Sequence, residues 1–282
     1  MSAAPADARI ATAVQALGLA RPKVVALDGG VANRSYRLRA AGQDLALKLT
    51  GESADALGAN PQSELAMHSL AAGAGLAPPV VLADPARGFI VSRFVTGRVL
   101  SADDFGDPRL LLRVGAWVAA LHALPVPAGL PRVDLGERAA GYLARVVAQA
   151  GDRFARDLMS ALALRRAALP PPARPAACHH DLHHRNFIDD GARLMVVDWE
   201  YGGSGDPAAD LASCIGYHDL GEAAVEALLA GYGSPDAALR ARIAALGWIF
   251  DCLWYAWNAA AELAGLAPDP AEQARLAARL AH

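Results

Sequence analysis

The feature that most constrains the fold is a polar run at residues 179–186, with an acid at the end of the apolar stretch that follows. The run reads His-His-Asp-Leu-His-His-Arg-Asn, so Asp181 and Asn186 stand five residues apart. A strand-like segment at 193–197 then leads directly into Asp198. A short hairpin brings the outer ends of its two strands to one edge. We therefore expect the two acids and the amide to lie close together.

Phosphoryl transfer from ATP needs this combination of two carboxylates and an amide. One carboxylate accepts the proton of the attacking hydroxyl, and we assign this role to Asp181. An amide oxygen and a second carboxylate hold the magnesium that bridges the phosphates, because hard cations prefer oxygen ligands. We assign these roles to Asn186 and Asp198. The predicted cofactors are therefore ATP and Mg²⁺.

The same residues resemble the protein-kinase signature His-x-Asp-Leu-x-x-x-x-Asn followed by Asp-Phe-Gly, with the same gap between acid and amide. Trp199 and Glu200 stand here in place of the Phe and the Gly. The run Asp-Trp-Glu-Tyr-Gly-Gly from residue 198, with Gly-Asp-Pro at 205–207 and Asp-Leu-Ala at 210–212, resembles the aminoglycoside phosphotransferase and choline kinase superfamily. Its Asp-Trp-Glu-Tyr is similar to the choline, ethanolamine and thiamine kinase branch.

This resemblance implies an α+β, two-lobed protein-kinase-like fold, with a small antiparallel-sheet N-lobe and a mainly helical C-lobe. We place the boundary near residues 95–97. Residues 1–95 then form the nucleotide-binding lobe, and 96–282 form the catalytic and acceptor-binding lobe. The residue pattern agrees, because it turns helical after Gly97, whereas strand-like runs dominate before it. The predicted strands lie at 35–38, 44–49, 78–82 and 88–94.

Residues 29–36, Gly-Gly-Val-Ala-Asn-Arg-Ser-Tyr, resemble the nucleotide loop of the family. The resemblance implies that the backbone at Gly30 and the side chains of Asn33 and Ser35 bond phosphate oxygens, as backbone N–H groups do in anion-binding turns. The segment is not a Walker loop, because no glycine-rich run here ends in Gly-Lys-Ser/Thr. Taken alone, it would be an ordinary hairpin turn.

Lys48 follows this loop by one hairpin, where kinases place the lysine that binds phosphates. Such a lysine needs an acidic partner. Asn60 and Pro61 supply a cap and a first-turn proline, which predicts a helix that carries Glu64 in its first turn. By resemblance Glu64 is the partner of Lys48, although acids also favour helix N-termini through the dipole. Glu52 is the competing candidate.

The acceptor side is predicted from an aromatic helix at residues 250–258. Trp254 and Trp257 are three residues apart and share one helix face, which most often packs into a core. Choline kinases have a similar Trp-x-x-Trp that walls a cation pocket, and Tyr201 matches the tyrosine of that cage. Each aromatic contact with a cation gives roughly 0.5–2 kcal/mol. The resemblance implies a small cationic acceptor, choline first and ethanolamine or thiamine next. Tyr217 or a neighbour stands where some choline kinases have a glutamate.

Several alternatives stay open on the sequence. A metal-dependent hydrolase with zinc or iron could draw its ligands from the acids of the central run and its histidines, His179, His180, His183 and His184, but it would not need Lys48. Within the same fold, the acceptor could be an aminoglycoside or a sugar. A nucleotide-binding pseudoenzyme is disfavoured because lysine, base and both magnesium ligands are present.

Composition narrows the class of protein further. The chain has 282 residues and is 54% hydrophobic, enough for a substantial core. The net charge of −3 and the absence of a basic stripe argue against nucleic acid as a partner. Three cysteines without pairing or metal spacing indicate reduced thiols, and no signal peptide is evident, so we expect a cytoplasmic protein. The apolar helical stretch 239–264 carries charged residues and is predicted to be a core helix.

Overall fold

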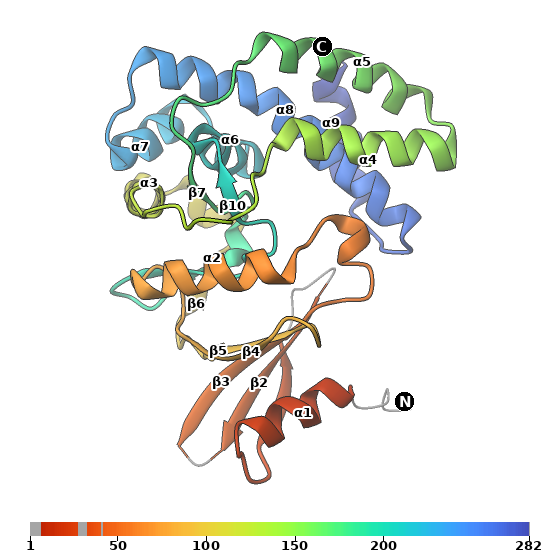
Figure 1. The fold of residues 1–282 in the computed structure, drawn as a ribbon. Helices are drawn as coiled ribbons and strands as arrows, with labels where there is room; N and C mark the ends of the chain where they lie inside the picture. Colours follow the sequence, from red (N-terminus) through yellow and green to blue (C-terminus); the bar gives the residue numbers. More distant parts are fainter. Residues whose placement is uncertain (1–6, 28–32, 41, 282) are drawn as a thin grey trace.

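A five-stranded antiparallel sheet forms the N-terminal part of the computed structural model, which describes residues 7–27, 33–40 and 42–281 (Figure 1). The order of its strands is β1-β2-β3-β5-β4. The strands are β1 (Lys23–Leu27), β2 (Arg34–Ala40), β3 (Gln43–Leu49), β4 (Val80–Asp84) and β5 (Phe89–Arg93). Strands β1 and β2, β2 and β3, and β4 and β5 are antiparallel pairs, while β3 pairs with β5 and not with β4. The pair of β2 and β3 is the hairpin that the sequence predicts.

The two faces of β3 have different neighbours. Side chains alternate along a strand, so Leu45, Leu47 and Leu49 are buried in a small core that α1 (Ala8–Ala16) helps to cover. Lys48 lies between two of these leucines and points to the opposite face. Helix α2 (Pro61–Gly73) packs between β4 and the helical part of the molecule (Figure 1). Its N-cap is Asn60, as predicted.

The rest of the chain is mainly helical and holds the larger core. Helix α8, the longest, packs against α4 and α6, while α3 packs against α7. The helices of this part are α3 (Pro108–His122), α4 (Leu135–Ala150), α5 (Arg153–Ala168), α6 (Pro207–His218), α7 (Glu222–Tyr232), α8 (Ala237–Leu263) and α9 (Pro270–Leu280). Short 3-10 turns are η1 (Asp55–Leu57), η2 (Ala102–Gly106) and η3 (His184–Asn186).

Two small sheets hold the central loop in place. One has the order β6-β8-β9 and the other pairs β10 with β7. Their strands are β6 (Arg98–Val99), β7 (Ala176–Cys178), β8 (Phe187–Asp189), β9 (Leu194–Val196) and β10 (Gly203–Gly205). Phe187 pairs with Val196 in the β8–β9 hairpin, so the polar run before β8 and the acid after β9 emerge at the same edge.

These elements confirm the predicted α+β class, with an antiparallel-sheet N-terminal region and a helical remainder. The lobe boundary near 95–97 stays a prediction; it falls between β5, the last strand of the large sheet, and β6, which pairs with β8. The segment predicted as a core helix is α8, and its central residues are buried. No helix in the described part of the chain is both long and apolar enough to cross a bilayer.

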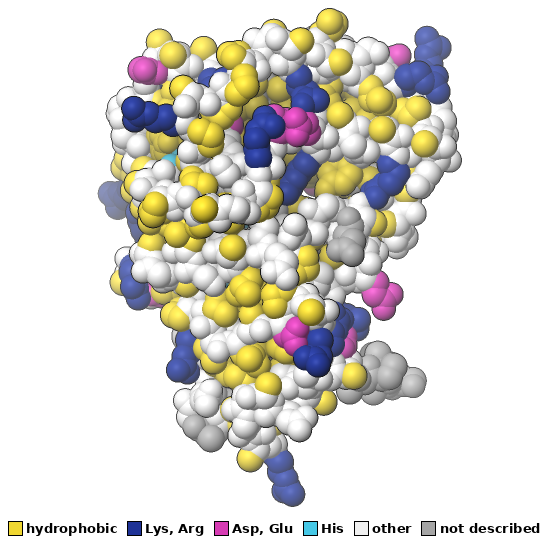
Figure 2. Space-filling view, viewed as in Figure 1, with side chains coloured by type: hydrophobic (Ala, Val, Ile, Leu, Met, Phe, Trp, Pro, Cys, Tyr) yellow, Lys and Arg dark blue, Asp and Glu magenta, His cyan; other side chains and the backbone are white. Residues whose placement is uncertain are grey.

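The surface carries mixed charge. On the face shown in Figure 2, basic side chains are scattered among acidic and apolar ones and do not gather into one patch. This distribution agrees with the small net charge of −3.

Candidate active site

The central loop begins where β7 ends and carries the predicted base. Asn186 closes η3, and its side-chain Nδ2 donates to the backbone oxygen of Asp181 at 2.8 Å and to Oδ2 of the same residue at 2.9 Å. This leaves the amide oxygen of Asn186 without a hydrogen bond from any described residue. The second carboxylate oxygen of Asp181, Oδ1, accepts a hydrogen bond of 2.6 Å from the hydroxyl of Tyr217 on α6. Both oxygens of the predicted base are therefore held in place.

Burial raises the pKa of Asp181 above its ordinary value, which suits a group that must accept a proton. The nearby His179 ring and the hydrogen bonds from Tyr217 and Asn186 act in the opposite direction. The carboxylate therefore stays available as a base while its pKa lies closer to neutrality than that of an exposed aspartate.

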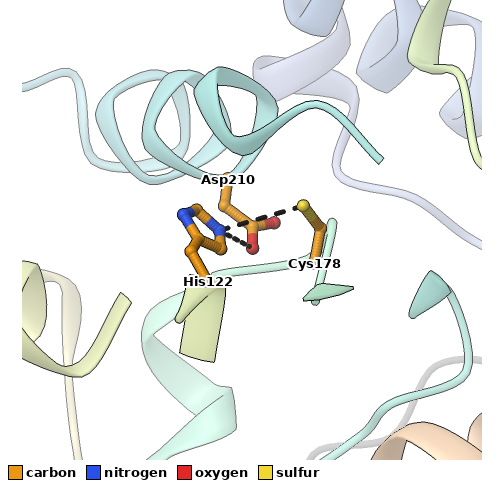
Figure 3. A group of neighbouring side chains, drawn as sticks. All are labelled: His122, Cys178 and Asp210. Atoms are coloured by element: carbon orange, nitrogen blue, oxygen red, sulfur yellow. Dashed lines mark hydrogen bonds and ion pairs between the residues drawn. The ribbon is translucent and has the colours of Figure 1, made fainter. Parts of the chain in front are cut away.

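Asp210, in the first turn of α6, braces this loop from behind (Figure 3). Its two carboxylate oxygens accept the backbone N–H groups of His179 at 2.9 Å and His180 at 2.6 Å, and Nε2 of His122 lies 3.1 Å away. Burial alone would raise the pKa of Asp210, but these hydrogen bonds and the nearby histidines hold it at about 2. His180 has φ +63°, a conformation that non-glycine residues rarely adopt, so the loop needs this support.

Three side chains of the types that bind metal ions meet in this cluster: His122, Cys178 and Asp210 (Figure 3). It is the one place in the described residues where the ligand atoms of three His, Cys, Asp or Glu side chains lie within 4.8 Å of one another. Because both oxygens of Asp210 are already used by the loop, we read this cluster as a structural network. Three of the four histidines of the central run use at least one ring nitrogen in a hydrogen bond, whereas the buried Nε2 of His180 and Nδ1 of His184 have no partner among the described residues. His179 and His180 contact backbone oxygens, and His183 accepts the N–H of Arg185. The geometry gives no support to the hydrolase alternative.

Lys48 lies among three acids. Its Nζ is 2.6 Å from Glu64 Oε1, 2.5 Å from Asp198 Oδ1 and 3.7 Å from Glu200 Oε2. Burial disfavours the charge of Lys48, yet the three acids raise its pKa well above the ordinary value. Glu64 is buried in the first turn of α2, where the sequence placed it, whereas Glu52 is exposed and lies outside this cluster.

Asp198 follows β9 and has φ +67°, so the chain turns sharply at this residue. Two residues later, Glu200 is buried and accepts a hydrogen bond of 2.8 Å from Asn33 Nδ2. Burial is the main reason why the pKa of Glu200 is raised to about 7. The contact between Glu200 and Asn33 also ties the N-terminal sheet to the segment that carries Asp198.

The residues fit a magnesium ion. Val197 N donates to the backbone oxygen of Asn186 at 2.9 Å. The segments that carry the predicted ligands Asn186 and Asp198 therefore run side by side. Asn186 offers its amide oxygen, because only its amide nitrogen is used in hydrogen bonds with described residues. Asp198 offers Oδ2, because Lys48 contacts Oδ1. The pKa values of Glu64 and Glu200 are raised mainly by burial and further by the charge of Asp198, and carboxylates outnumber cations here, which leaves an excess of negative charge. A divalent cation with oxygen ligands would relieve it.

A pocket of about 450 Å³, which we call the central pocket, adjoins these groups. Tyr201 and Trp257 meet at its wall, with Trp257 Nε1 donating to the tyrosine hydroxyl at 2.9 Å. Trp254 packs edge-on against Tyr217, their ring centroids 4.7 Å apart. The structure thus brings these predicted acceptor residues to the same pocket as Asp181. Others of the predicted set that line it are Asn33, Asn186 and Asp198.

The predicted phosphate loop is placed only in part. Gly30 lies outside the described residues. Ser35 is half-buried on β2, directly opposite Lys48 in the strand register. Both ends of the Asn33 amide are occupied, because its oxygen accepts Gly51 N at 3.1 Å and its nitrogen binds Glu200. The phosphate contacts of these three residues stay predictions.

Sequence reasoning assigned no site role to several residues that line the central pocket. They are Arg138, Glu200, Tyr217, Asp269 and Glu272. A signal existed for Glu200, which belongs to the Asp-Trp-Glu-Tyr motif, and for Tyr217, because the resemblance places Tyr217 or a neighbour where some choline kinases have a glutamate. The helices that carry the other three have no motif, so only their packing shows that they reach the pocket.

Solved structures share this fold over nearly the whole chain. A choline/ethanolamine kinase family protein from Mesorhizobium loti is 28% identical, with a TM-score of 0.77, over 97% of this chain and 93% of that one. Choline kinase LicA from Streptococcus pneumoniae is 21% identical, with a TM-score of 0.80, over 97% and 96% of the two chains. LicA has also been solved in complex with AMP. The predicted kinase-like fold is therefore confirmed.

Sequence comparison reaches a similar group of proteins. Thiamine kinase of Shigella boydii is 42% identical over 50 residues, which is 18% of this chain and 18% of that protein, so the match spans less than a fifth of this curated relative. The model of the phosphotransferase enzyme family matches residues 23–246, from β1 into α8. This match covers most of the chain and every described residue of the predicted site up to Tyr201, and the chain therefore belongs to the phosphotransferase enzyme family.

Proposed function

We propose that this phosphotransferase moves the γ-phosphoryl group of ATP, with Mg²⁺, to a hydroxyl of a small cationic metabolite. Choline is the first candidate, and ethanolamine or thiamine is the next. The observation that carries the proposal is the convergence of Asp181, Asn186 and Asp198 on one pocket, with Lys48 held beside them by Glu64. The cytoplasm is the location that we propose with this activity.

In the proposed reaction, the oxygen of the acceptor hydroxyl bonds to the γ-phosphorus, and the bond from that phosphorus to the β–γ bridging oxygen breaks. Asp181 accepts the proton of the hydroxyl, and ADP leaves with the bridging oxygen. Lys48 orients the phosphates, and Glu64 fixes the position of the lysine. Bound Mg²⁺ would neutralise charge on the phosphate oxygens. Asn186 and Asp198 are the residues that would hold it.

Nucleotide as the phosphoryl donor is supported by the family and by LicA, which shares the fold and has been solved with AMP. Lys48 supports it independently. Its side chain is largely buried against three acids. Its ammonium group contacts Asp198, the residue predicted to bind magnesium. In kinases this position carries the lysine that meets the α- and β-phosphates.

The cationic acceptor is supported by the charge of the central pocket. Its acids outnumber its arginines: Asp181, Asp198, Glu200, Asp269 and Glu272 against Arg138 and Arg185. Aromatic walls and acids together favour a positive group. A choline/ethanolamine kinase family protein and a thiamine kinase are among the similar proteins. The same acids would suit an aminoglycoside, which is the second candidate acceptor.

A screen of Mg²⁺-dependent ATP consumption tests the proposal. The acceptors are choline, ethanolamine, thiamine, aminoglycosides and amino sugars, each with and without EDTA. Asp181→Asn is the matched control, because it removes the base but keeps the size of the side chain. We expect turnover to fall roughly 10²–10⁴-fold in this variant. Turnover that needs no magnesium, or that survives in Asp181→Asn, would contradict the proposal.

A further inference from the structure

Arg138 brings a positive charge into the central pocket from α4. It lies in the first turns of that helix and lines the pocket together with Asp181 and Tyr201. Its guanidinium carbon is 5.1 Å from the centre of the Tyr201 ring. The side chain is half-buried. A charge in this position normally needs a compensating partner.

Among the described residues, no acid lies within 4 Å of this guanidinium. Half-buried Arg145 also lacks an acid but donates to the backbone oxygen of Ala56, and other half-buried arginines have acidic partners. Arg113 meets Asp189, and Arg242 meets Asp206, each at 2.6 Å. Burial accordingly lowers the pKa of Arg138, while Asp189 raises that of Arg113.

The acids nearest to Arg138 are already used. On its own helix, the N-cap Asp134 and the first-turn Glu137 pair with Arg132 and Arg166. Glu200, which faces the same pocket, accepts a hydrogen bond from Asn33 and lies beside Lys48. Asp181, the other acid whose charge acts on Arg138, accepts hydrogen bonds from Tyr217 and Asn186.

The ring of Tyr201 does not replace such a partner. A cation–π contact is worth about 0.5–2 kcal/mol and leaves the N–H groups of a guanidinium unsatisfied. The nitrogens of Arg138 form no hydrogen bond with a described residue, yet none of them is sealed from solvent. They are open to whatever enters the central pocket.

Two further acids lie at another wall of the central pocket, each with a local partner: Asp269 Oδ1 accepts the N–H of Ala271 at 2.9 Å, and Glu272 Oε1 lies 3.5 Å from Arg275. Asp269 caps α9, and Glu272 follows in its first turn. The charges that act on Glu272 are those of Arg275, Asp269 and Arg185. The pKa of Arg138 is affected by a different set of charges, those of Tyr142, Tyr201, Glu200 and Asp181. The central pocket therefore has two acids at α9, with Arg185 also among its lining residues, and, at α4, an arginine without an acidic partner in the described part of the chain.

We propose that the acceptor is a small hydroxylated zwitterion, an amino alcohol that also carries a carboxylate, and that Arg138 binds this carboxylate. A guanidinium presents paired N–H groups that match a carboxylate, which a bare ammonium alcohol cannot use. The ammonium end would face Asp269 and Glu272. The inference rests on the proposed function. It adds a carboxylate to the positively charged acceptor proposed there.

Pairs of acceptors that differ by one carboxylate test this assignment. Serine is ethanolamine with a carboxylate on the carbon that bears the ammonium group, and homoserine has the same relation to 3-aminopropanol. For choline, a carboxylate replaces one hydrogen of an N-methyl group. Direct calorimetric titration measures binding without turnover, and coupled ADP release measures kcat/KM. We expect at least one carboxylate-bearing member to exceed its parent roughly tenfold or more in both measurements.

Arg138→Gln should remove this preference. For the carboxylate-bearing member, kcat/KM should fall roughly 10- to 100-fold, while its parent should change little and the KM for ATP should stay constant. Arg132→Gln is the matched control, because it removes the same charge at a residue that does not line the central pocket. Thermal melts of both variants separate binding from packing.

The outcomes are distinct. Equal losses for every acceptor would place Arg138 on the transferred phosphoryl group or in the core, and would overturn the inference. Turnover of choline, ethanolamine or thiamine without any gain from a carboxylate would also overturn the inference, but it would uphold the proposed function. A panel in which no carboxylate-bearing alcohol binds would overturn the inference as well. Binding of a carboxylate-bearing alcohol that is lost in Arg138→Gln, without magnesium-dependent turnover, would uphold the inference and contradict the function.

Discussion

The hydroxyl of Tyr217 donates a hydrogen bond of 2.6 Å to Oδ1 of Asp181. Asn186 donates to the other oxygen, so the carboxylate is oriented from two sides before any acceptor arrives. Burial raises the pKa of Tyr217 well above its ordinary value, and the phenol therefore remains a donor throughout the physiological range. A hydrogen bond from a neutral donor stabilises the ionised carboxylate. Tyr217 is thus a positioning residue that also tunes the base.

Tyr217→Phe should move the acidic limb of the pH–kcat/KM profile to higher pH. The hydrogen bond lowers the pKa of Asp181, so its loss lets that pKa rise, and a smaller fraction of the base is ionised at a given acidic pH. A hydrogen bond to a charged group is worth about 1.5–3 kcal/mol, which corresponds to roughly one to two pH units. Full pH–rate profiles measure the shift.

Tyr36→Phe is the control for this experiment, because it removes the same atom from a half-buried tyrosine on β2, away from the central pocket. Its profile should match that of the parent. An acidic limb that stays in place in Tyr217→Phe would show that the contact does not set the ionisation of the base.

The sequence allowed the centre of the site to be predicted because that part depends on local rules. Asp198 ends a short hairpin that starts just after Asn186, so their proximity follows from strand pairing. Glu64 could be placed because Asn60 and Pro61 fix the start of α2 and thereby the residues of its first turn. The division into an antiparallel sheet and a helical region likewise follows from hydrophobic periodicity.

The parts that could not be predicted depend on packing between distant elements. Arg138 reaches the central pocket because α4 packs against α8, and the sequence of α4 alone does not reveal this. The phosphate contact of Asn33 stays a prediction, and only the fold shows that Glu200, 167 positions away, accepts a hydrogen bond from its amide. Asp206 reads as the cap of a helix start, and Asp210 resembles a family position that braces the catalytic loop. The fold adds which backbone N–H groups the Asp210 carboxylate accepts, those of His179 and His180.

Asp198→Asn should raise the magnesium concentration needed for half-maximal turnover. The change removes one negative oxygen from the predicted ligand set, and even the loss of an outer partner typically weakens a metal site 10–100-fold. KM for the acceptor should change far less. Activity titrations with Mg²⁺ provide the measurement. Asp190→Asn, in the exposed turn after β8, is the control. If both variants needed as much magnesium as the parent, the ligand assignment would be wrong.

Trp254→Ala and Trp257→Ala should each raise KM for the acceptor while KM for ATP stays nearly constant. Both side chains line the central pocket, and lost aromatic contacts weaken binding of a charged group by about 0.5–2 kcal/mol each. Trp248→Ala is a matched control on the same helix, since Trp248 packs against Arg165 outside that pocket. Two-substrate kinetics beside thermal melts separate the cases. Lower melting temperatures with an unchanged acceptor KM would assign both tryptophans to the core.

Glu200→Gln should stabilise the protein increasingly as the pH rises from about 4.5 to 7. In the parent the folded-state pKa of Glu200 is about 7, above its ordinary value of 4.5, so in this range the unfolded chain binds fewer protons than the folded one. Stability then falls with rising pH, by up to about 3 kcal/mol from this group, and glutamine removes the loss.

Buried histidines such as His180, whose pKa is lowered to about 4, produce the opposite trend in both proteins. The informative quantity is therefore the difference in unfolding free energy between variant and parent, measured by urea denaturation at pH 5, 6, 7 and 8 without magnesium. That difference should grow up to about pH 7 and then level off; a constant difference would mean that Glu200 is ionised in the folded protein already at pH 5.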